Sequence, residues 1–223
     1  MQVEWYGQSA FRLTDGGTTV FIDPFGDMSG LAAARGMQFD YPPIEGVDAD
    51  VVLVTHEHHD HNHVNAIDGS PAVLRSTAGR LDTPIGEVIA VASEHDEHAG
   101  TDRGPNTIFV FDFGGVRCAH FGDFGQSGLR EEQAEAIGTA QLLFIPVGGG
   151  PTIGAAQAAA ISERLGARLV VPMHYRTARV NFLEPADPFL ERIGNVQRLD
   201  EPRFDTAELP ADKAPLAVVP AAP

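Results

Sequence analysis

Five histidines lie within eight residues, directly after a short apolar run. Residues 51–54, Val-Val-Leu-Val, form a continuous apolar stretch that is typical of a strand buried on both faces. The segment Thr55-His56-Glu57-His58-His59-Asp60-His61-Asn62-His63 follows it. A loop that leaves a buried strand is a rigid mount for functional side chains, and imidazole and carboxylate are ligands for zinc, manganese or iron. The sequence therefore indicates a metal site here, against the alternatives of a solvated loop or an incidental surface site.

The spacing within this cluster suggests how the side chains divide. Residues two apart in an extended stretch point the same way, so His56 and His58 can converge on one ion. Asp60 and His61 could face a second ion if the chain turns into a helix there.

The rest of the chain predicts strands first and alternating strands and helices later. Residues 24–48 are rich in Gly and Pro without a clear period, and we expect a long functional or mobile loop there. Helices are expected at 129–137, 154–165 and 186–194. Strands are expected at 2–6, 10–14, 18–23, 51–54, 71–75, 86–92, 107–113, 116–121, 141–147 and 168–173.

This order predicts an α+β fold with two sheets packed face to face and helices outside. We expect one domain over residues 1–200. Residues 201–223 form a tail rich in Pro and Ala that could pack on the domain, contain one more strand at 215–219, or remain extended or mobile.

Composition narrows the classes of partner. The formal net charge is −16, from 31 acidic and 15 basic residues, so a polyanion such as nucleic acid is a poor partner. The single cysteine, Cys118, excludes an internal disulfide, which fits a reducing cytosol. We find neither a signal peptide nor an apolar stretch long enough to span a membrane. We therefore expect a cytoplasmic protein with a small-molecule substrate, and its oligomeric state stays open.

The pattern His56-x-His58-x-Asp60-His61 resembles the signature of the metallo-β-lactamase superfamily. Four further residues resemble the remaining parts of that signature, in the same order along the chain: Asp23, His95 in Ser-Glu-His-Asp, Asp123 in Phe-Gly-Asp, and His174 in Pro-Met-His-Tyr. The resemblance covers roughly residues 1–195. It implies the four-layer αβ/βα sandwich of that superfamily.

The resemblance also implies a dinuclear site, most simply of two Zn²⁺ ions, with Mn²⁺ or iron as alternatives. Asp123 would bridge the two ions, and Asp23 would brace the metal loop. Asp60 would additionally orient a bridging hydroxide or pass its proton to the leaving group. The ligands implied for the first ion are His56, His58 and His95, and those for the second are Asp60, His61 and His174.

Within the superfamily, three segments are similar to the branch related to ascorbate-6-phosphate lactonase, whose members are described as predicted zinc-dependent hydrolases. These segments are Arg103-Gly104-Pro105-Asn106-Thr107, His120-Phe121-Gly122-Asp123 and Ile145-Pro146-Val147-Gly148-Gly149. One residue departs from the branch: relatives often have His after the early Trp-x-Gly, where this chain has Gln8.

Other polar residues have weaker assignments. Asn106, Tyr175 and Arg176 could contact substrate, although Arg176 could equally form a surface salt bridge. His95 is preferred to His98 as a ligand because it follows the strand at 86–92. His59 and His63 are expected to be exposed or to support the ligands, and His120 is either a buried strand residue or faces the cleft.

We therefore predict a hydrolase that acts on a small ester-like molecule, a lactone or a phosphodiester. Two alternatives remain. One is a di-iron redox enzyme on the same fold, disfavoured because such enzymes typically have Glu where this chain has His58, and carry a flavin domain. The other is a non-catalytic metal-binding protein, disfavoured because the ligand set is complete.

Overall fold

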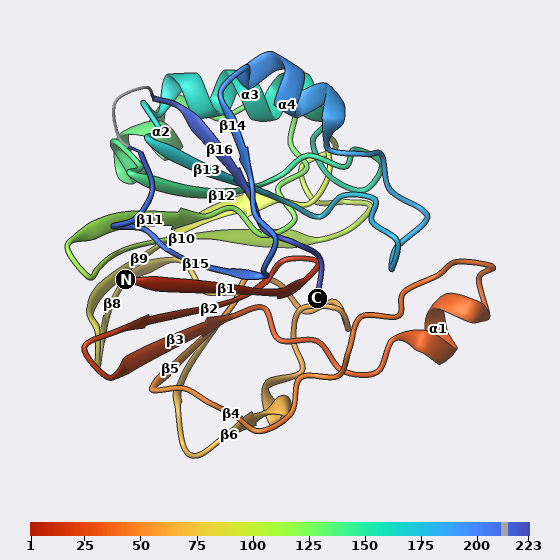
Figure 1. Ribbon diagram of the computed structural model, residues 1–223, viewed down its shortest axis with the longest axis horizontal. Coiled ribbons are helices and arrows are strands. Elements are labelled where there is room, and N and C mark those ends of the chain that lie inside the picture. Colours follow the sequence, from red (N-terminus) through yellow and green to blue (C-terminus); the bar gives the residue numbers. More distant parts are fainter. Residues whose placement is uncertain (211–213) are drawn as a thin grey trace.

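Two mixed β-sheets stack face to face in the computed structural model, which describes residues 1–210 and 214–223 (Figure 1). The first sheet has six strands, in the order β15 (Arg203–Asp205), β1 (Gln2–Gly7), β2 (Ala10–Asp15), β3 (Thr18–Ile22), β5 (Val51–Val54) and β7 (Ala72–Arg75). Strands β1 to β3 form an antiparallel meander, and β3, β5 and β7 run parallel.

The second sheet has eight strands. Their order is β14 (Val196–Arg198), β16 (Leu216–Val219), β13 (Leu169–Met173), β12 (Leu142–Pro146), β11 (Val116–His120), β10 (Pro105–Phe113), β9 (Gly86–Glu94) and β8 (Gly79–Thr83). Strands β8 to β11 are antiparallel neighbours, whereas β11, β12, β13 and β16 run parallel.

The main core lies between the two sheets. It is built from alternating inward side chains of both sheets, and Phe11 and Phe144 meet across it with ring centroids 4.6 Å apart. Both phenylalanines are fully buried, and burial of a side chain of this size contributes about 2–3 kcal/mol each.

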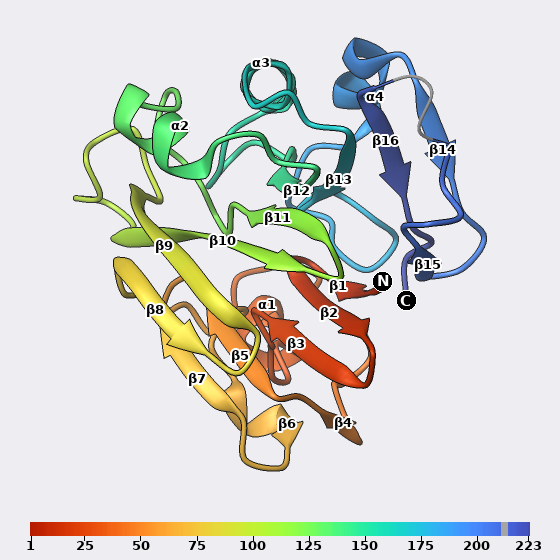
Figure 2. The same ribbon diagram turned by 90° about the vertical axis from the view of Figure 1, so that its left-hand side faces the viewer.

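Helices cover the outer face of the eight-stranded sheet. They are α2 (Glu131–Ile137), α3 (Ala155–Arg164) and α4 (Asp187–Ile193), and Figure 2 shows them above the sheet. The outer face of the six-stranded sheet has its own apolar cluster, in which Phe21 and Val52 pack under Phe25 and Phe39 of the 24–48 segment. The predicted α+β sandwich of two mixed sheets is confirmed.

The predicted strands and helices agree with the structure to within two residues at each end. The 24–48 segment departs from the prediction of an unbroken loop, because it contains α1 (Ser29–Ala33) and β4 (Val47–Asp48), which pairs with β6 (Ile67–Asp68). The N-cap residue of α1, Met28, makes no side-chain cap hydrogen bond, and the first N–H of the helix, that of Ser29, is bound by Asp27 one residue earlier, so the usual signal of a helix start is displaced. Strand β8 was also missed, because Gly-Arg-Leu-Asp-Thr is mostly polar and lies at the edge of its sheet.

The tail joins both sheets. Strand β15 pairs with β1, and β16, predicted at 215–219, pairs with β13. Residues 211–213, also part of the predicted tail, lie outside the described residues. Across the described part of the chain, every helix is too short or too polar to cross a lipid bilayer.

Candidate metal centre

A buried network around Asp23 forms the base of the candidate site, at the carboxyl end of β3. The Asp23 carboxylate accepts hydrogen bonds from the backbone N–H of Thr55 at 2.8 Å, from Thr55 Oγ1 at 2.7 Å and from Nδ1 of His61 at 2.9 Å. Nδ1 of His56 lies 3.1 Å from the same hydroxyl, which already donates to Asp23, so the imidazole N–H is the donor. Both rings therefore present Nε2 to the centre, as the atom free to bind a cation.

Three histidines form one group of potential ligands. His56 and His58 follow β5, and His95 follows β9 in the other sheet. One nitrogen of each ring lies within 4.8 Å of the others. The alternation predicted for the 56–58 stretch thus brings these two rings to the same side.

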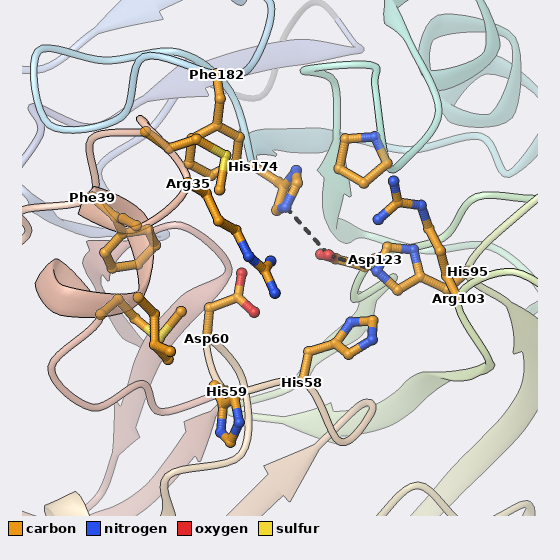
Figure 3. A pocket seen from close by; sticks show the side chains of 15 residues that line it. Arg35, Phe39, His58, His59, Asp60, His95, Arg103, Asp123, His174 and Phe182 are labelled. Atoms are coloured by element: carbon orange, nitrogen blue, oxygen red, sulfur yellow. Dashed lines mark ion pairs between the residues drawn. The ribbon is translucent and has the colours of Figure 1, made fainter.

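The second group is Asp60, His61 and His174, whose ligand atoms also lie within 4.8 Å of one another. Asp123 stands between the two groups. Its Oδ2 lies 3.2 Å from Nε2 of His95 and 3.2 Å from Nε2 of His174 (Figure 3), and its Oδ1 lies 3.3 Å from Nε2 of His61. The structure therefore brings together all seven side chains that the sequence analysis named as ligands.

The close packing of these ligand side chains shifts the pKa values of several of them. Burial lowers the pKa of His56 well below its usual value, which keeps the ring neutral. Burial also opposes ionisation of Asp123, yet His174 and His61 hold its pKa well below the usual range. Burial lowers the pKa of His61 too, but the carboxylates of Asp123 and Asp60 outweigh it and raise that pKa well above its ordinary value. A centre that attracts a proton so strongly also attracts a metal cation, which competes for the same atom.

The donor set fits a metal ion. Nε2 of His56 and Nε2 of His61 are buried and have no hydrogen-bond partner among the described residues. Buried polar atoms rarely stay unpartnered, and here they face a carboxylate oxygen across a distance that a shared cation would bridge. Imidazole and carboxylate together suit zinc, iron or manganese.

The backbone beside the ligands is closely packed. Gly122 has φ +53°, and a Cβ there would lie 2.5 Å from Thr55 Oγ1 and 2.5 Å from Asn106 Oδ1. Asn106 Oδ1 also accepts a hydrogen bond from the backbone N–H of Asp123 at 3.1 Å. This contact explains why glycine precedes Asp123, since any side chain would push the carboxylate out of place. His174 itself has a positive φ of 50°, a strained conformation of the kind found at functional sites.

A pocket of about 590 Å³ opens above the two groups (Figure 3). One wall is largely apolar and comes from the 24–48 segment and Phe182, and the floor holds His58, Asp60, His95, Asp123 and His174. Its full lining is Met28, Leu31, Ala32, Arg35, Met37, Phe39, His58, His59, Asp60, His95, Arg103, Asp123, Pro151, His174 and Phe182.

The three residues suggested for substrate contact lie elsewhere, outside this lining. Asn106 is buried, and its Nδ2 donates to Ser93 Oγ and to the carbonyl of Phe121. Tyr175 is buried against Trp5, with ring centroids 5.6 Å apart. Arg176 is exposed, and its Nε donates to the carbonyl of Leu183 at 2.6 Å.

The structure distinguishes His95 from the four histidines outside the two ligand groups by their burial and position. His95 is buried in the centre, whereas His98 is exposed and pairs with Asp102 at 2.6 Å. His59 is exposed on the pocket rim, and His63 is exposed. His120 is fully buried and faces the core rather than the pocket.

Sequence reasoning missed three residues of this region. Thr55 precedes the histidine motif directly, and its position next to Asp23 could be inferred only once the strand order was known. Arg35 and Arg103 line the pocket. Arg103 starts one of the branch-like segments, which was a usable signal, but Arg35 lies in the aperiodic 24–48 segment, where no signal exists.

Comparison with known proteins places these features in a family. Residues 2–174 match the family model of the Beta-lactamase superfamily domain. A UPF0173 metal-dependent hydrolase from Methanosphaera stadtmanae is 28% identical over 206 residues, which cover 79% of this chain and 85% of that protein.

Solved structures agree on the fold. A Thermotoga maritima protein, described as a candidate Zn-dependent hydrolase of the metallo-β-lactamase superfamily, superimposes with a TM-score of 0.76 at 28% identity, covering 98% of this chain and 97% of its own. A diiron β-hydroxylase from Streptomyces venezuelae superimposes with a TM-score of 0.53 at 19% identity, covering 78% of this chain and 44% of its own, which is a likeness of fold alone.

Proposed function

The chain belongs to the β-lactamase superfamily as a metal-dependent hydrolase, and from that membership we propose that it cleaves a small ester-like molecule, a lactone or a phosphodiester, at a dinuclear metal site. The observation that carries this proposal is the convergence of seven imidazole and carboxylate side chains from both sheets beneath one pocket.

We assign each side chain a role within this proposal. Asp123 lies between the two groups of ligands and would bridge the two ions. Asp23 fixes the ring of His61 through Nδ1. His56, His58 and His95 would hold one ion, and Asp60, His61 and His174 would hold the other.

A pair of bound divalent cations, most simply Zn²⁺, lowers the pKa of a water from about 15.7 toward ~7 and polarises a carbonyl or phosphoryl oxygen. The chain supplies the positioning and the proton transfer. Asp60 lines the pocket and accepts a hydrogen bond from Nε2 of Gln8 at 3.3 Å, which orients its carboxylate. Its pKa lies below the usual range: burial opposes this shift, but His61 outweighs it. An ionised Asp60 can accept a proton and pass it to the leaving oxygen.

The substrate class rests on similarity as well as on chemistry. The segments at 103–107, 120–123 and 145–149 are similar to the branch related to ascorbate-6-phosphate lactonase, which supports including lactones. A redox function with iron is the second candidate, because imidazole and carboxylate ligands also suit iron. The metal that co-purifies with the chain, together with the oxygen dependence of turnover, separates the two.

The test combines metal analysis with a panel of ester, lactone and phosphodiester substrates. We expect His58→Ala and Asp123→Ala to reduce bound metal and to lower kcat/KM by at least about 100-fold, because each removes a ligand. His98→Ala is the matched control, since this imidazole is exposed and outside the pocket. Full hydrolytic activity in a metal-free preparation refutes the proposal, and iron with oxygen-dependent turnover favours the redox alternative.

A further inference from the structure

Two arginine side chains, Arg35 and Arg103, point into the pocket from its two sides (Figure 3). Most arginines of this chain are satisfied by a carboxylate, as Arg75 is by Glu57 at 2.6 Å. In the part of the chain that the structure describes, neither pocket guanidinium has such a partner. Both cations are therefore available to a ligand.

Local structure fixes where Arg35 stands. It follows α1, and its backbone N–H donates to the carbonyl of Ala32 at 3.0 Å. Gly36 then takes a left-handed φ of +67°, and the N–H of Met37 returns to the same carbonyl at 2.9 Å. This left-handed turn ends the helix, and Figure 3 shows that the Arg35 side chain extends toward Asp60.

The position of Arg103 is fixed by Asp96. The Asp96 carboxylate accepts hydrogen bonds from four backbone N–H groups of the 95–104 loop, including that of Arg103 at 2.8 Å. The same loop begins with His95, whose N–H donates to the carbonyl of Gly104 at 3.1 Å. The loop that presents a candidate ligand thus also presents the arginine beside it.

The charges in the pocket do not cancel. The only carboxylates in its described lining are Asp60 and Asp123, and the proposed function uses both as ligands. Bound cations would neutralise these two, which leaves both guanidiniums uncompensated in a chain of net charge −16. An excess of positive charge confined to one concave site in an acidic protein favours an anionic substrate.

The wall formed by the 24–48 segment and Phe182 favours an apolar group. Leu31 is 47% exposed and lines the pocket, so its side chain meets solvent until a ligand covers it. Met28, Met37 and Phe182 continue this apolar surface.

Building on the proposed function, we propose that the substrate is an anionic ester in which a phosphoryl or carboxylate oxyanion binds Arg35 and Arg103 and an apolar substituent packs against Leu31. Hydrolysis breaks the bond between the phosphorus or acyl carbon and the leaving oxygen. Water supplies the new oxygen on the former and the proton on the latter.

The experiment compares Arg35→Met and Arg103→Met with Arg192→Met, which removes the same charge from an exposed position on α4 outside the pocket. The substrates are bis(p-nitrophenyl) phosphate, p-nitrophenyl hemisuccinate and the neutral p-nitrophenyl acetate. We expect each pocket variant to lower the ratio of kcat/KM for the preferred anion to that for the acetate by about tenfold or more, with bound metal unchanged. The ratio should be unchanged in Arg192→Met. The anionic substrate whose relative kcat/KM falls more in the pocket variants shows whether the arginines bind a phosphate or a carboxylate.

A second arm tests the apolar wall. Leu31→Ser should reduce the preference for phenyl over methyl p-nitrophenyl phosphate by about tenfold. An unchanged preference contradicts the assigned wall.

Equilibrium binding separates failure of this inference from failure of the proposed function. Diphenyl phosphate should bind the metal-loaded wild type at least about tenfold more tightly than either pocket variant, measured by calorimetry. If the wild type and the two pocket variants have equal affinities and equal kinetic ratios, the proposed role of the arginines in anion selectivity is wrong, while the hydrolase assignment stands. If the wild type cleaves neither these esters nor the lactones of the substrate panel, the proposed function fails, and the binding difference alone decides the role of the arginines.

Discussion

At Gly122 the chain passes between Thr55 and Asn106 with no room for a side chain. Thr55 donates to Asp23, and Asn106 accepts from the backbone of Asp123, so this one contact joins the supports of two candidate ligands. The supports of the centre are therefore as sensitive to substitution as the ligands themselves.

We expect Gly122→Ala to lower the free energy of unfolding by at least about 2 kcal/mol, because the new methyl group overlaps Thr55 and Asn106 and the backbone φ is unfavourable. Bound metal should fall with it. Gly46→Ala is the matched control, since Gly46 has a similar φ of +64° with open space around it, and it should cost only about 1 kcal/mol. Denaturant unfolding and metal analysis give both quantities, and equal losses in the two variants would refute the steric argument.

Single residues could be predicted where their positions follow strand periodicity. His56 and His58 follow from spacing after a buried strand, and the structure gathers them as expected. His61 was expected on a helix but lies in a turn, where its N–H donates to the carbonyl of His58 at 3.0 Å. Arg35 and Arg176 show what the sequence could not predict. Which of them reaches the pocket depends on the path of the loops, and that path follows from tertiary contacts such as the bond from Arg176 to Leu183.

Among the elements, strands were easier to predict than the segments that connect them. Apolar runs such as 51–54 and 169–173 bury every side chain, which makes their signal strong. Strand β8 and helix α1 have mostly exposed residues and no such signal. Of these two, α1 contributes to the pocket wall, so part of that wall comes from an element without a strong sequence signal.

The 95–104 loop has a defined structure without being a helix or strand, because four of its backbone N–H groups donate to the Asp96 carboxylate. Burial opposes ionisation of Asp96, but these donors hold its pKa below the ordinary range. We expect Asp96→Ala to speed amide hydrogen exchange over residues 97–104 and to weaken metal binding by about tenfold, because His95 starts this loop.

Asp112→Ala serves as the comparison for that variant, since this exposed carboxylate pairs with Arg117 at 3.2 Å, outside the pocket. Unaltered exchange in the 97–104 segment of Asp96→Ala would show that the loop is held by other contacts.

On the scale of the whole molecule, His120 connects the two sheets. It lies at the end of β11, its Nε2 donates to the carbonyl of Ser9 in the turn between β1 and β2 at 3.0 Å, and its Nδ1 accepts from the N–H of Gly122 at 3.2 Å. Burial lowers the pKa of His120 from 6.5 to about 4. The folded protein thus keeps this ring neutral at a pH where the unfolded chain protonates it.

Because the folded pKa of His120 is depressed, the unfolded state binds more protons between about pH 6.5 and 4, and stability falls as the pH drops through this range. We expect the metal-free wild type to lose up to about 1 kcal/mol per pH unit there through His120. His120→Gln should be less stable overall but should have a flatter profile, measured by denaturant unfolding at several pH values. Identical slopes would contradict the assignment.

His98→Gln provides the control for this titration. Asp102 raises the pKa of His98, so its contribution is complete below the unfolded pKa and is lost only as the pH rises above about 6.5. The slope between pH 4 and 6.5 should therefore stay as in the wild type.

The candidate ligands span positions 56 to 174 and project from both sheets. No local hairpin or helix can assemble such a centre, because its parts meet only after sequence-distant strands have paired. The chain consequently gains affinity for a cation only late in folding. Release of a bound ion would then report that the two sheets have separated.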